Sequence, residues 1–122
     1  MASILVAEDN VLNFELVRDV LVARGHEVQW SRDGMDTLAQ ARSGAFDLML
    51  LDLHMPKLSG LQVLEQLREK PGRRRPRILV VSADAMGDIA SEVIAAGADA
   101  YISKPIEVGS LTQEVEKQLR TS

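Results

Sequence analysis

Short segments rich in valine, isoleucine and leucine alternate along the chain with longer segments in which apolar residues recur at helical spacing. The short segments predict β-strands, and the longer ones predict helices with one buried face. The predicted strands cover residues 3–7, 27–31, 48–51, 78–82 and 100–103. Unbroken apolar runs such as "LMLL" indicate strands that are buried on both faces of a sheet.

A predicted helix comes after each predicted strand. The positions that define the five helices are Phe14, Val17 and Leu21; Met35, Leu38 and Arg42 with Ala39; Val63, Leu64 and Leu67; Ile89, Val93 and Ala96; and Leu111, Val115 and Leu119. The first four helical segments are followed by Gly25, by Gly44, by the pair Pro71 and Gly72, and by Gly97, where helix caps or breaks belong. The chain therefore consists of five strand–helix units.

Alternation of strands and helices predicts an α/β fold with a parallel sheet covered on both faces, because right-handed crossovers return the chain to the same edge. For five units we expect a doubly wound, flavodoxin-like sheet of strand order 2-1-3-4-5 flanked by five helices. No interdomain linker interrupts the pattern, so residues 1–122 are taken as one domain. Ligands of such sheets bind at the carboxyl ends of the strands, here between strands one and three.

The composition is that of an ordinary globular protein, with 46% hydrophobic and 26% charged residues. The absence of cysteine excludes disulfides, thiol catalysis and thiolate zinc sites. No signal peptide is evident, and no segment approaches the ~18 consecutive apolar residues of a membrane span. We therefore expect a cytoplasmic protein that does not bind membranes. The net charge of −4 argues against nucleic acid as its main partner.

The basic residues are unevenly distributed, since five of the fourteen lie in "KPGRRRPR", residues 70–77. Two prolines and a glycine make this segment an irregular loop. We favour a solvated connector, and the alternative is a docking patch for an anionic group. The loop leads to the amino end of a strand, opposite the edge where ligands are expected.

Several strands deliver polar residues to the carboxyl edge of the predicted sheet. These residues are Glu8 and Asp9 after strand one, Asp52 after strand three, Ser82 at strand four, and Lys104 after strand five. Taken singly, an acid or a serine before a helix is usually a cap or a turn former. Helix caps need not lie near one another, whereas these residues share one location. The shared location favours a common chemical role.

A cluster of three carboxylates needs a counter-charge. Two carboxylates ~4 Å apart repel by about 4 kcal/mol at an effective dielectric constant near 20. Lys104 supplies one positive charge, and an all-oxygen ligand set with few protein donors suits Mg2+. His26 and His54 lack metal-ligand spacing, and we interpret both as surface or loop residues.

Asp52 is the candidate nucleophile because it lies on the central strand, whereas the Glu8 and Asp9 pair is better placed to hold a metal. A carboxylate can attack phosphorus and form an aspartyl phosphate. Ser82 could then hydrogen-bond a phosphoryl oxygen and Lys104 could offset its charge, as phosphoryl transfer requires. The sequence thus predicts phosphorylation at Asp52.

Four motifs resemble the receiver (CheY-like) domain of bacterial two-component response regulators of the single-domain type. They are "VAEDN", "LLDLHMPKLSG", "VVSADA" and "AYISKPI", in the family's order and spacing over essentially the whole chain. The resemblance implies the five-stranded fold derived above. It also implies that a histidine kinase or a histidine phosphotransfer protein donates a phosphoryl group to the aspartate, with Mg2+ as cofactor.

The resemblance assigns roles residue by residue. It makes Asp52 the phosphoacceptor, places the metal on Glu8, Asp9, Asp52 and the backbone carbonyl of His54, and gives Ser82 and Lys104 the conserved hydroxyl and lysine positions. Tyr101 matches the aromatic switch residue, and we favour this role over the alternative of a half-buried strand tyrosine. The peptide bond between Lys104 and Pro105 is typically cis in the family. Ser82 stands where threonine is commoner, and His54 and Asp84 flank the attacking water in relatives, so the phosphoryl lifetime stays open.

The implied mechanism is a conformational shift rather than enzymatic turnover, with the chain assisting its own phosphorylation and dephosphorylation. In relatives helix four, strand five and helix five form the output face for a downstream protein target. The small-residue segment "GDIASEVIAAGA" is the expected moving helix. The first helix, with Phe14 near its start, is the expected kinase-docking surface.

Two rival functions fit the sequence less well. Haloacid-dehalogenase-like phosphatases also use an aspartate at a strand tip, but they need a second acid two residues on, where this chain has His54. A pseudo-receiver that only binds partners usually lacks part of the acidic set, which is complete here. Whether the chain acts alone or as part of a longer protein is left open.

Overall fold

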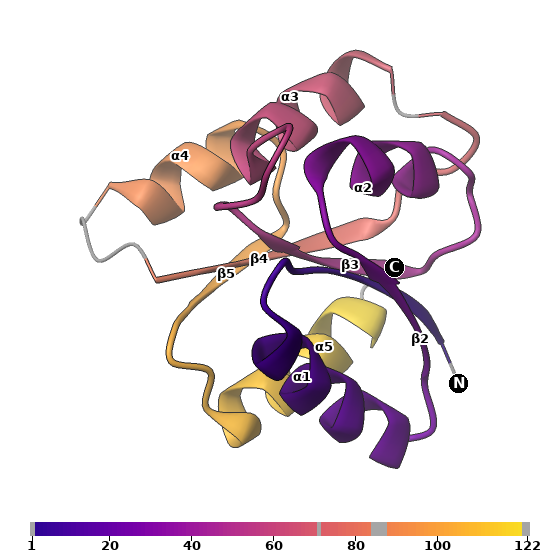
Figure 1. Cartoon of the computed structure of the whole chain (residues 1–122), viewed down its shortest axis with the longest axis vertical. Coiled ribbons are helices and arrows are strands. Elements are labelled where there is room, and N and C mark those ends of the chain that lie inside the picture. Colours follow the sequence, from indigo (N-terminus) through magenta and orange to yellow (C-terminus); the bar gives the residue numbers. More distant parts are fainter. Residues whose placement is uncertain (1, 71, 84–87, 121–122) are drawn as a thin grey trace.

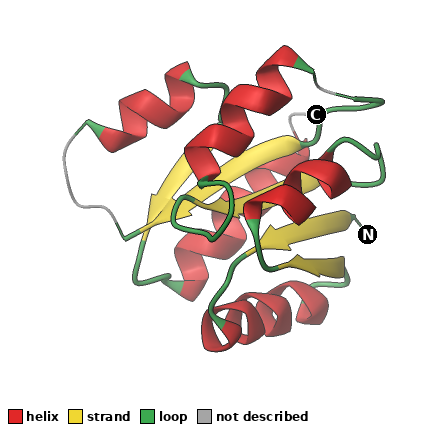
Figure 2. Cartoon of the chain, turned by 45° about the horizontal axis from the view of Figure 1, so that its top comes forward, coloured by secondary structure: helices red, strands yellow, loops and turns green. Residues whose placement is uncertain are grey.

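The computed structural model describes residues 2–70, 72–83 and 88–120. These residues form one sheet of parallel strands in the order β2-β1-β3-β4-β5 (Figures 1 and 2). The strands are β1 Ser3–Ala7, β2 Glu27–Ser31, β3 Leu48–Asp52, β4 Arg77–Ser82 and β5 Ala100–Ser103. The predicted fold class and strand order are confirmed. Pro71 and Asp84, which entered the sequence argument, lie outside the described residues.

Helices cover both faces of the sheet. They are α1 Val11–Ala23, α2 Gly34–Ala41, α3 Gly60–Glu69, α4 Ile89–Ala95 and α5 Val108–Arg120. Figure 1 shows α1 and α5 on one face and α2, α3 and α4 on the other. Within the described part of the chain, no helix is both long and apolar enough to cross a membrane.

Strand β3 lies at the centre of the sheet, which explains why its sequence is an unbroken apolar run. All five of its residues are buried. Met49 and Leu51 pack in the core beneath α2, α3 and α4, whereas Leu48 and Leu50 pack in the core beneath α1 and α5. Burying a leucine side chain stabilises the fold by about 1.5–3 kcal/mol, so this strand is a rigid base for the acid at its tip, Asp52.

Two glycines occupy positions where the local geometry requires glycine, one at each edge of the sheet. Gly97 follows α4 and has a φ of 119°, a backbone conformation that residues other than glycine rarely adopt. Gly60 begins α3, and a Cβ atom there would lie 2.5 Å from the backbone oxygen of Asp52. Glycine at position 60 therefore lets the start of α3 approach the tip of β3.

The buried face of α2 differs from the one predicted. Met35 is 56% exposed and Ala39 is also exposed, whereas Gly34, Thr37, Leu38 and Ala41 are buried. The Thr37 hydroxyl lies 2.8 Å from the hydroxyl of Ser31 and donates to the carbonyl of Asp33 at 2.7 Å. Because the hydroxyl of Thr37 is hydrogen-bonded, this polar residue can face the core, and Met35 lies on the exposed face of the helix.

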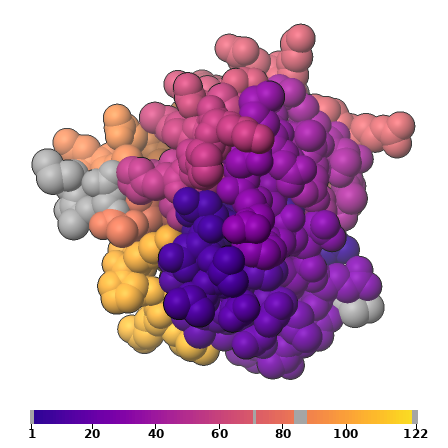
Figure 3. All heavy atoms as spheres, in the orientation of Figure 1, coloured from indigo at the N-terminus to yellow at the C-terminus, as the bar shows by residue number. Residues whose placement is uncertain are grey.

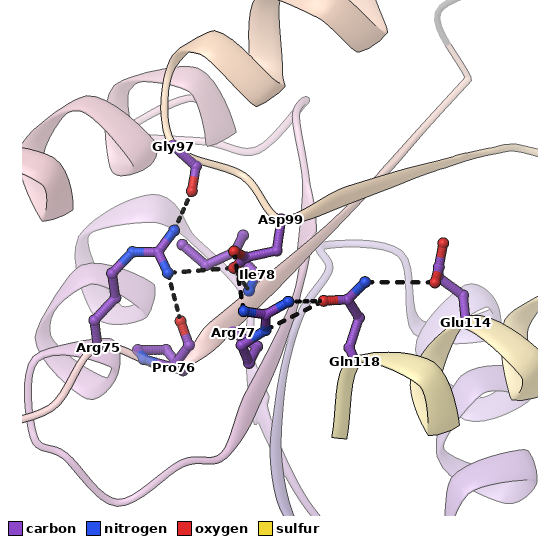
Figure 4. Close-up of polar contacts among 8 residues, drawn as sticks. All are labelled: Arg75, Pro76, Arg77, Ile78, Gly97, Asp99, Glu114 and Gln118. Atoms are coloured by element: carbon purple, nitrogen blue, oxygen red, sulfur yellow. Dashed lines mark hydrogen bonds and ion pairs between the residues drawn. The ribbon is translucent and has the colours of Figure 1, made fainter. Parts of the chain in front are cut away.

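The basic segment after α3 is more than a solvated connector. Arg74 pairs with Asp47 at 2.5 Å, Arg75 pairs with Asp99 at 3.2 Å, and Arg75 also donates to the carbonyl of Gly97. Figure 4 shows how Asp99 lies between Arg75 and Arg77, and how Arg77 continues to Gln118 of α5. These contacts tie the loop to the amino ends of β4 and β5. Figure 3 shows part of the segment projecting from the body of the molecule, and the alternative of a docking role stays untested.

Candidate functional site

The carboxyl edge of the sheet brings together the acids that the sequence placed there. Ala7 lies opposite Leu51 in the β1–β3 pairing, so the residues that come next, Glu8 and Asp52, become neighbours. One carboxylate oxygen each from Glu8, Asp9 and Asp52 lies within 4.8 Å of the others. The prediction that these carboxylates converge is confirmed.

Lys104 bridges two of the three acids. Its Nζ atom donates to Oε1 of Glu8 at 3.0 Å and to Oδ2 of Asp52 at 2.9 Å. The Lys104 side chain is 18% exposed, and those of Glu8 and Asp52 are 6% and 7% exposed. Charge-assisted hydrogen bonds of this length in a buried setting fix the orientation of both partners. One ammonium group nevertheless leaves the cluster with an excess of negative charge.

The environment separates the pKa values of the two buried acids. Burial, followed by the nearby Asp52, raises the pKa of Glu8 from 4.5 to about 7. Burial also opposes ionisation of Asp52, but hydrogen bonds from Glu8, from the backbone N–H of His54 and from Lys104 outweigh it and lower the pKa of Asp52. Asp52 is thus the ionised member of the pair. An ionised carboxylate is the form that can act as a nucleophile.

The pKa of Lys104 is raised. Burial alone would lower it, but its hydrogen bonds to Asp52 and then to Glu8 prevail. Lys104 therefore keeps its positive charge at physiological pH, which is required if it is to offset the charge of a phosphoryl group.

The residues present fit a hard divalent cation. Among the described residues, the Oε2 atom of Glu8 is a buried side-chain atom with no hydrogen-bond partner. Such an acceptor is costly unless a proton or a cation satisfies it. Asp9 is exposed, so it leaves room for the water ligands that Mg2+ retains. The donor set, all carboxylate oxygen, matches the ligands that Mg2+ prefers.

The alternative that these acids are helix caps does not hold for Asp9 or Asp52. The side chain of Asn10 caps α1 by accepting the backbone N–H of Asn13 at 3.0 Å. Ser59 caps α3 in a capping box with Gln62. Neighbouring residues thus supply the caps, which leaves the carboxylates of Asp9 and Asp52 available to the crevice.

Ser82 and Tyr101 lie on the adjacent strands. Ser82 is fully buried at the end of β4, one residue beyond Val81, which is opposite Asp52. The Ser82 carbonyl accepts the backbone N–H of Lys104 at 2.9 Å and a long hydrogen bond from the Tyr101 hydroxyl at 3.5 Å. Tyr101 is half-buried against the core beneath α2, α3 and α4. The Tyr101 hydroxyl therefore lies at the backbone of Ser82, the residue with which Tyr101 is expected to change conformation.

The loop after β3 is tied to Asp52. The backbone N–H of His54 donates to Oδ1 of Asp52 at 3.0 Å, and the imidazole of His54 is exposed. The use of the His54 carbonyl as a metal ligand stays a prediction. His26 lies just before β2, where its Nδ1 atom accepts the backbone N–H of Ala2 at 3.2 Å, so it takes no part in the crevice. The peptide bond between Lys104 and Pro105 is cis, as the resemblance implied.

From the sequence, Phe14 was placed wrongly and Trp30 was missed. Phe14 is 5% exposed and stacks on Trp30, so it belongs to the core and not to a docking surface. The indole N–H of Trp30 donates to the backbone carbonyl of Glu8 at 2.7 Å. Composition and periodicity could not reveal this contact, because it joins residues 22 positions apart. The contact follows from the β1–β2 register, in which Val6 pairs with Trp30, and periodicity does not give this register.

The parallel sheet, the acidic crevice and its lysine define a receiver of two-component signalling. The response regulator receiver domain family matches residues 4–116, and the chain belongs to this family. Receiver domains of response regulators bind Mg2+ at the acidic site, and they interact with histidine kinases and downstream targets.

Individual relatives support this assignment. The chain is 36% identical to the polar-differentiation response regulator DivK of Brucella anthropi over 117 residues, which cover 96% of this chain and 95% of that protein. The CheY-like receiver domain protein of Methanospirillum hungatei JF-1 superposes with a TM-score of 0.87 at 26% identity, covering 99% and 95% of the two chains. The receiver domain of the sensor histidine kinase PA1611 from Pseudomonas aeruginosa PAO1, with a magnesium ion coordinated in its active site cleft, superposes with a TM-score of 0.86 at 25% identity, covering 97% of each chain.

Proposed function

We propose that Asp52 accepts a phosphoryl group from a phosphohistidine of a histidine kinase or histidine phosphotransfer protein, in a reaction that depends on Mg2+. One observation carries this proposal: Asp52 is held by Lys104 at 2.9 Å beside two further acids at the tip of the central strand. The chain would act as a phosphoacceptor that assists its own phosphorylation and dephosphorylation, and not as an enzyme that releases a modified substrate.

In the transfer step, a carboxylate oxygen of Asp52 forms a bond to phosphorus as the bond from phosphorus to the donor imidazole nitrogen breaks. Lys104 offsets the negative charge on the phosphoryl oxygens, and the Ser82 hydroxyl donates a hydrogen bond to one of them. Glu8, Asp9 and Asp52, with the His54 carbonyl, would hold Mg2+, which supplies charge neutralisation and orients the phosphoryl group when bound. These residues provide positioning and charge, which are the main requirements of phosphoryl transfer.

Phosphorylation would act as a switch because it adds about −1.5 to −2 charges at the crevice. Engagement of the Ser82 hydroxyl by the phosphoryl group would draw in the start of α4 and repack Tyr101. Helix α4 is suited to move, because Val93 is its one fully buried residue and its cap residue Asp88 makes no side-chain capping bond. The face formed by α4, β5 and α5 would then change its affinity for a downstream protein.

The histidine donor would dock beside the crevice on α1. Only the cap residue Asn10 separates the acids Glu8 and Asp9 from this helix, so its first turns border the site. Val11, Leu12 and Leu16 are 42%, 75% and 42% exposed there, which is an apolar surface suited to a partner helix. Figure 3 shows the indigo atoms of this part of the chain on the face that it views.

Acetyl phosphate tests the proposal without a protein partner. With Mg2+ it should add one phosphoryl group to the wild-type chain, and with EDTA or in Asp52→Ala it should add none, as measured by intact mass. Label that persists in Asp52→Ala would refute the assignment. Multiple turnovers of a phosphate monoester would favour a phosphatase instead.

A further inference from the structure

The turn that carries the two metal-binding acids is braced from the neighbouring strand by an aromatic side chain. The indole N–H of Trp30 in β2 donates to the backbone carbonyl of Glu8 at 2.7 Å, and the backbone N–H of Glu8 donates to the carbonyl of Ser31 at 2.9 Å. Both backbone groups of Glu8 are therefore held by β2. The backbone of this residue is fixed beyond the point where β1 itself ends, at Ala7.

The indole ring is itself held in a stack. Phe14 of α1 lies parallel to Trp30, with ring centroids 4.3 Å apart and an interplanar angle of 5°. The guanidinium of Arg32 lies 4.7 Å from the Trp30 centroid, and that of Arg18 lies 5.6 Å from the Phe14 centroid. Such stacking and cation–π contacts restrict the rotation of the ring, so the direction of the indole N–H is set before any ligand arrives.

The stack also joins the two sides of the acidic turn. Glu8 and Asp9 lie between the end of β1 and Asn10, the cap of α1. Trp30 holds the strand side through Glu8, and Phe14 holds the helix side because it lies in the first turns of α1. The backbone that carries the Glu8 carboxylate, whose Oε2 atom has no hydrogen-bond partner among the described residues, is thus held by a contact from outside the crevice.

We propose that Trp30 is a positioning residue for Mg2+ binding: its indole N–H fixes the backbone of Glu8 and thereby places the acidic pair for the metal. This inference rests on the proposed function, since it assumes that the crevice binds Mg2+. Partners that orient metal ligands from outside the coordination sphere typically contribute about 10–100-fold in affinity. We expect the low end, about tenfold, because Trp30 acts through the backbone of Glu8 and not on its carboxylate.

The test is the dissociation constant for Mg2+, measured by calorimetry at constant pH. Trp30→Phe removes the N–H and keeps a ring that can stack on Phe14. Replacement of Trp30 by 3-benzothienylalanine removes only the N–H, because sulfur takes the place of the nitrogen. Both should raise the dissociation constant about tenfold. The benzothienyl variant keeps the test decisive if Trp30→Phe folds poorly.

Two controls separate positioning from general loosening of β2. Val28→Ala truncates a partly buried residue of the same strand and should leave Mg2+ affinity unchanged. Replacement of Trp30 by 5-fluorotryptophan keeps the N–H and should retain the wild-type affinity. Because the chain has a single tryptophan, its one fluorine resonance should shift as Mg2+ is added.

The outcomes distinguish this inference from the function on which it rests. If the wild-type chain does not bind Mg2+, both are overturned. If the wild type binds Mg2+ and the two variants without the N–H are folded and bind it equally well, the inference alone is overturned. An equal loss of affinity in Val28→Ala would also overturn it, because the effect would then belong to the strand and not to the indole.

Discussion

Glu8 and Asp52 show how one environment gives two carboxyl groups different properties. Lys104 contacts both, but Asp52 also accepts the backbone N–H of His54, whereas the Oε2 atom of Glu8 has no hydrogen-bond partner among the described residues. Below about pH 7, the proton of the pair therefore resides on Glu8 and the negative charge on Asp52. The proposed nucleophile, Asp52, is kept ionised by its neighbours, and Glu8 would exchange its proton for a metal ion.

This difference predicts a pH dependence of stability without metal. The pKa of Glu8 is raised from 4.5 to about 7 on folding, so the folded chain binds this proton more tightly than the unfolded chain does. The stabilisation is complete below pH 4.5 and is lost as the pH rises through about 7. In EDTA, the free energy of unfolding of the wild type should fall across this window relative to Glu8→Gln, by about 3 kcal/mol.

Urea denaturation of both proteins across the pH range checks this prediction. His26 has a lowered pKa, which acts in the opposite direction because its stabilisation is lost as the pH falls, but it is common to both proteins and cancels in the difference. A constant difference between the two proteins would contradict the account of Glu8. Saturating Mg2+ should remove the fall in the wild type, because the metal replaces the proton.

At the scale of elements, α1 has a face buried in the core and an exposed apolar face. Its buried face contributes Phe14, Val17 and Leu21 to the core, and its exposed face carries Leu12 and Leu16 near the crevice. In the proposed transfer a donor histidine would have to reach Asp52, so its docking surface would have to border the crevice. The start of α1 meets this requirement and its end does not.

The position of the docking surface can be tested within this one helix. Leu12→Asp should slow transfer from a phosphorylated histidine donor at least tenfold, because it puts a charge into an apolar contact, and should leave labelling by acetyl phosphate unchanged. Val22→Asp is the matched control, since Val22 is 54% exposed at the far end of α1. Transfer kinetics with the donor that phosphorylates the wild type fastest decide the question. Equal effects of both substitutions would contradict docking at the start of α1.

Across the whole molecule, the central strands are packed more deeply than the elements proposed to respond to phosphorylation. Strands β1 and β3 are almost wholly buried and carry the acids, whereas α4 has one fully buried residue and β5 is half-exposed. The network of Arg75, Arg77 and Asp99 ties together the amino ends of β4 and β5, at the edge away from the crevice (Figure 4). A signal at the crevice would therefore move the near ends of α4 and β5.

Hydrogen exchange can monitor this response. Phosphorylation should change the exchange rates of amides in α4 and β5 and leave those of β1 and β3 unchanged. Ser82→Ala should still accept a phosphoryl group from acetyl phosphate but lose most of the change in α4, because the hydroxyl that links the group to this region is absent. An undiminished change in Ser82→Ala would show that the signal takes another route.

Features set by the topology of the whole chain were predictable from the sequence, whereas features that depend on side-chain contacts were not. Apolar runs located all five strands to within one residue at each end, and the order of a doubly wound sheet brought Glu8, Asp9, Asp52 and Lys104 together. The hydrophobic pattern placed Met35 on the buried face of α2, which was wrong. Periodicity considers only apolar residues and does not reveal that the hydroxyl of Thr37 is hydrogen-bonded in the core. It missed Trp30 because a bond between neighbouring strands depends on their register.

The most direct test of the central claim is the position of the phosphoryl group. Borohydride reduces an aspartyl phosphate to homoserine, which peptide mass spectrometry locates. After treatment with acetyl phosphate and Mg2+, homoserine should be found at position 52, and it should be absent when EDTA replaces Mg2+. Homoserine at another aspartate, or equal amounts with and without Mg2+, would contradict the account.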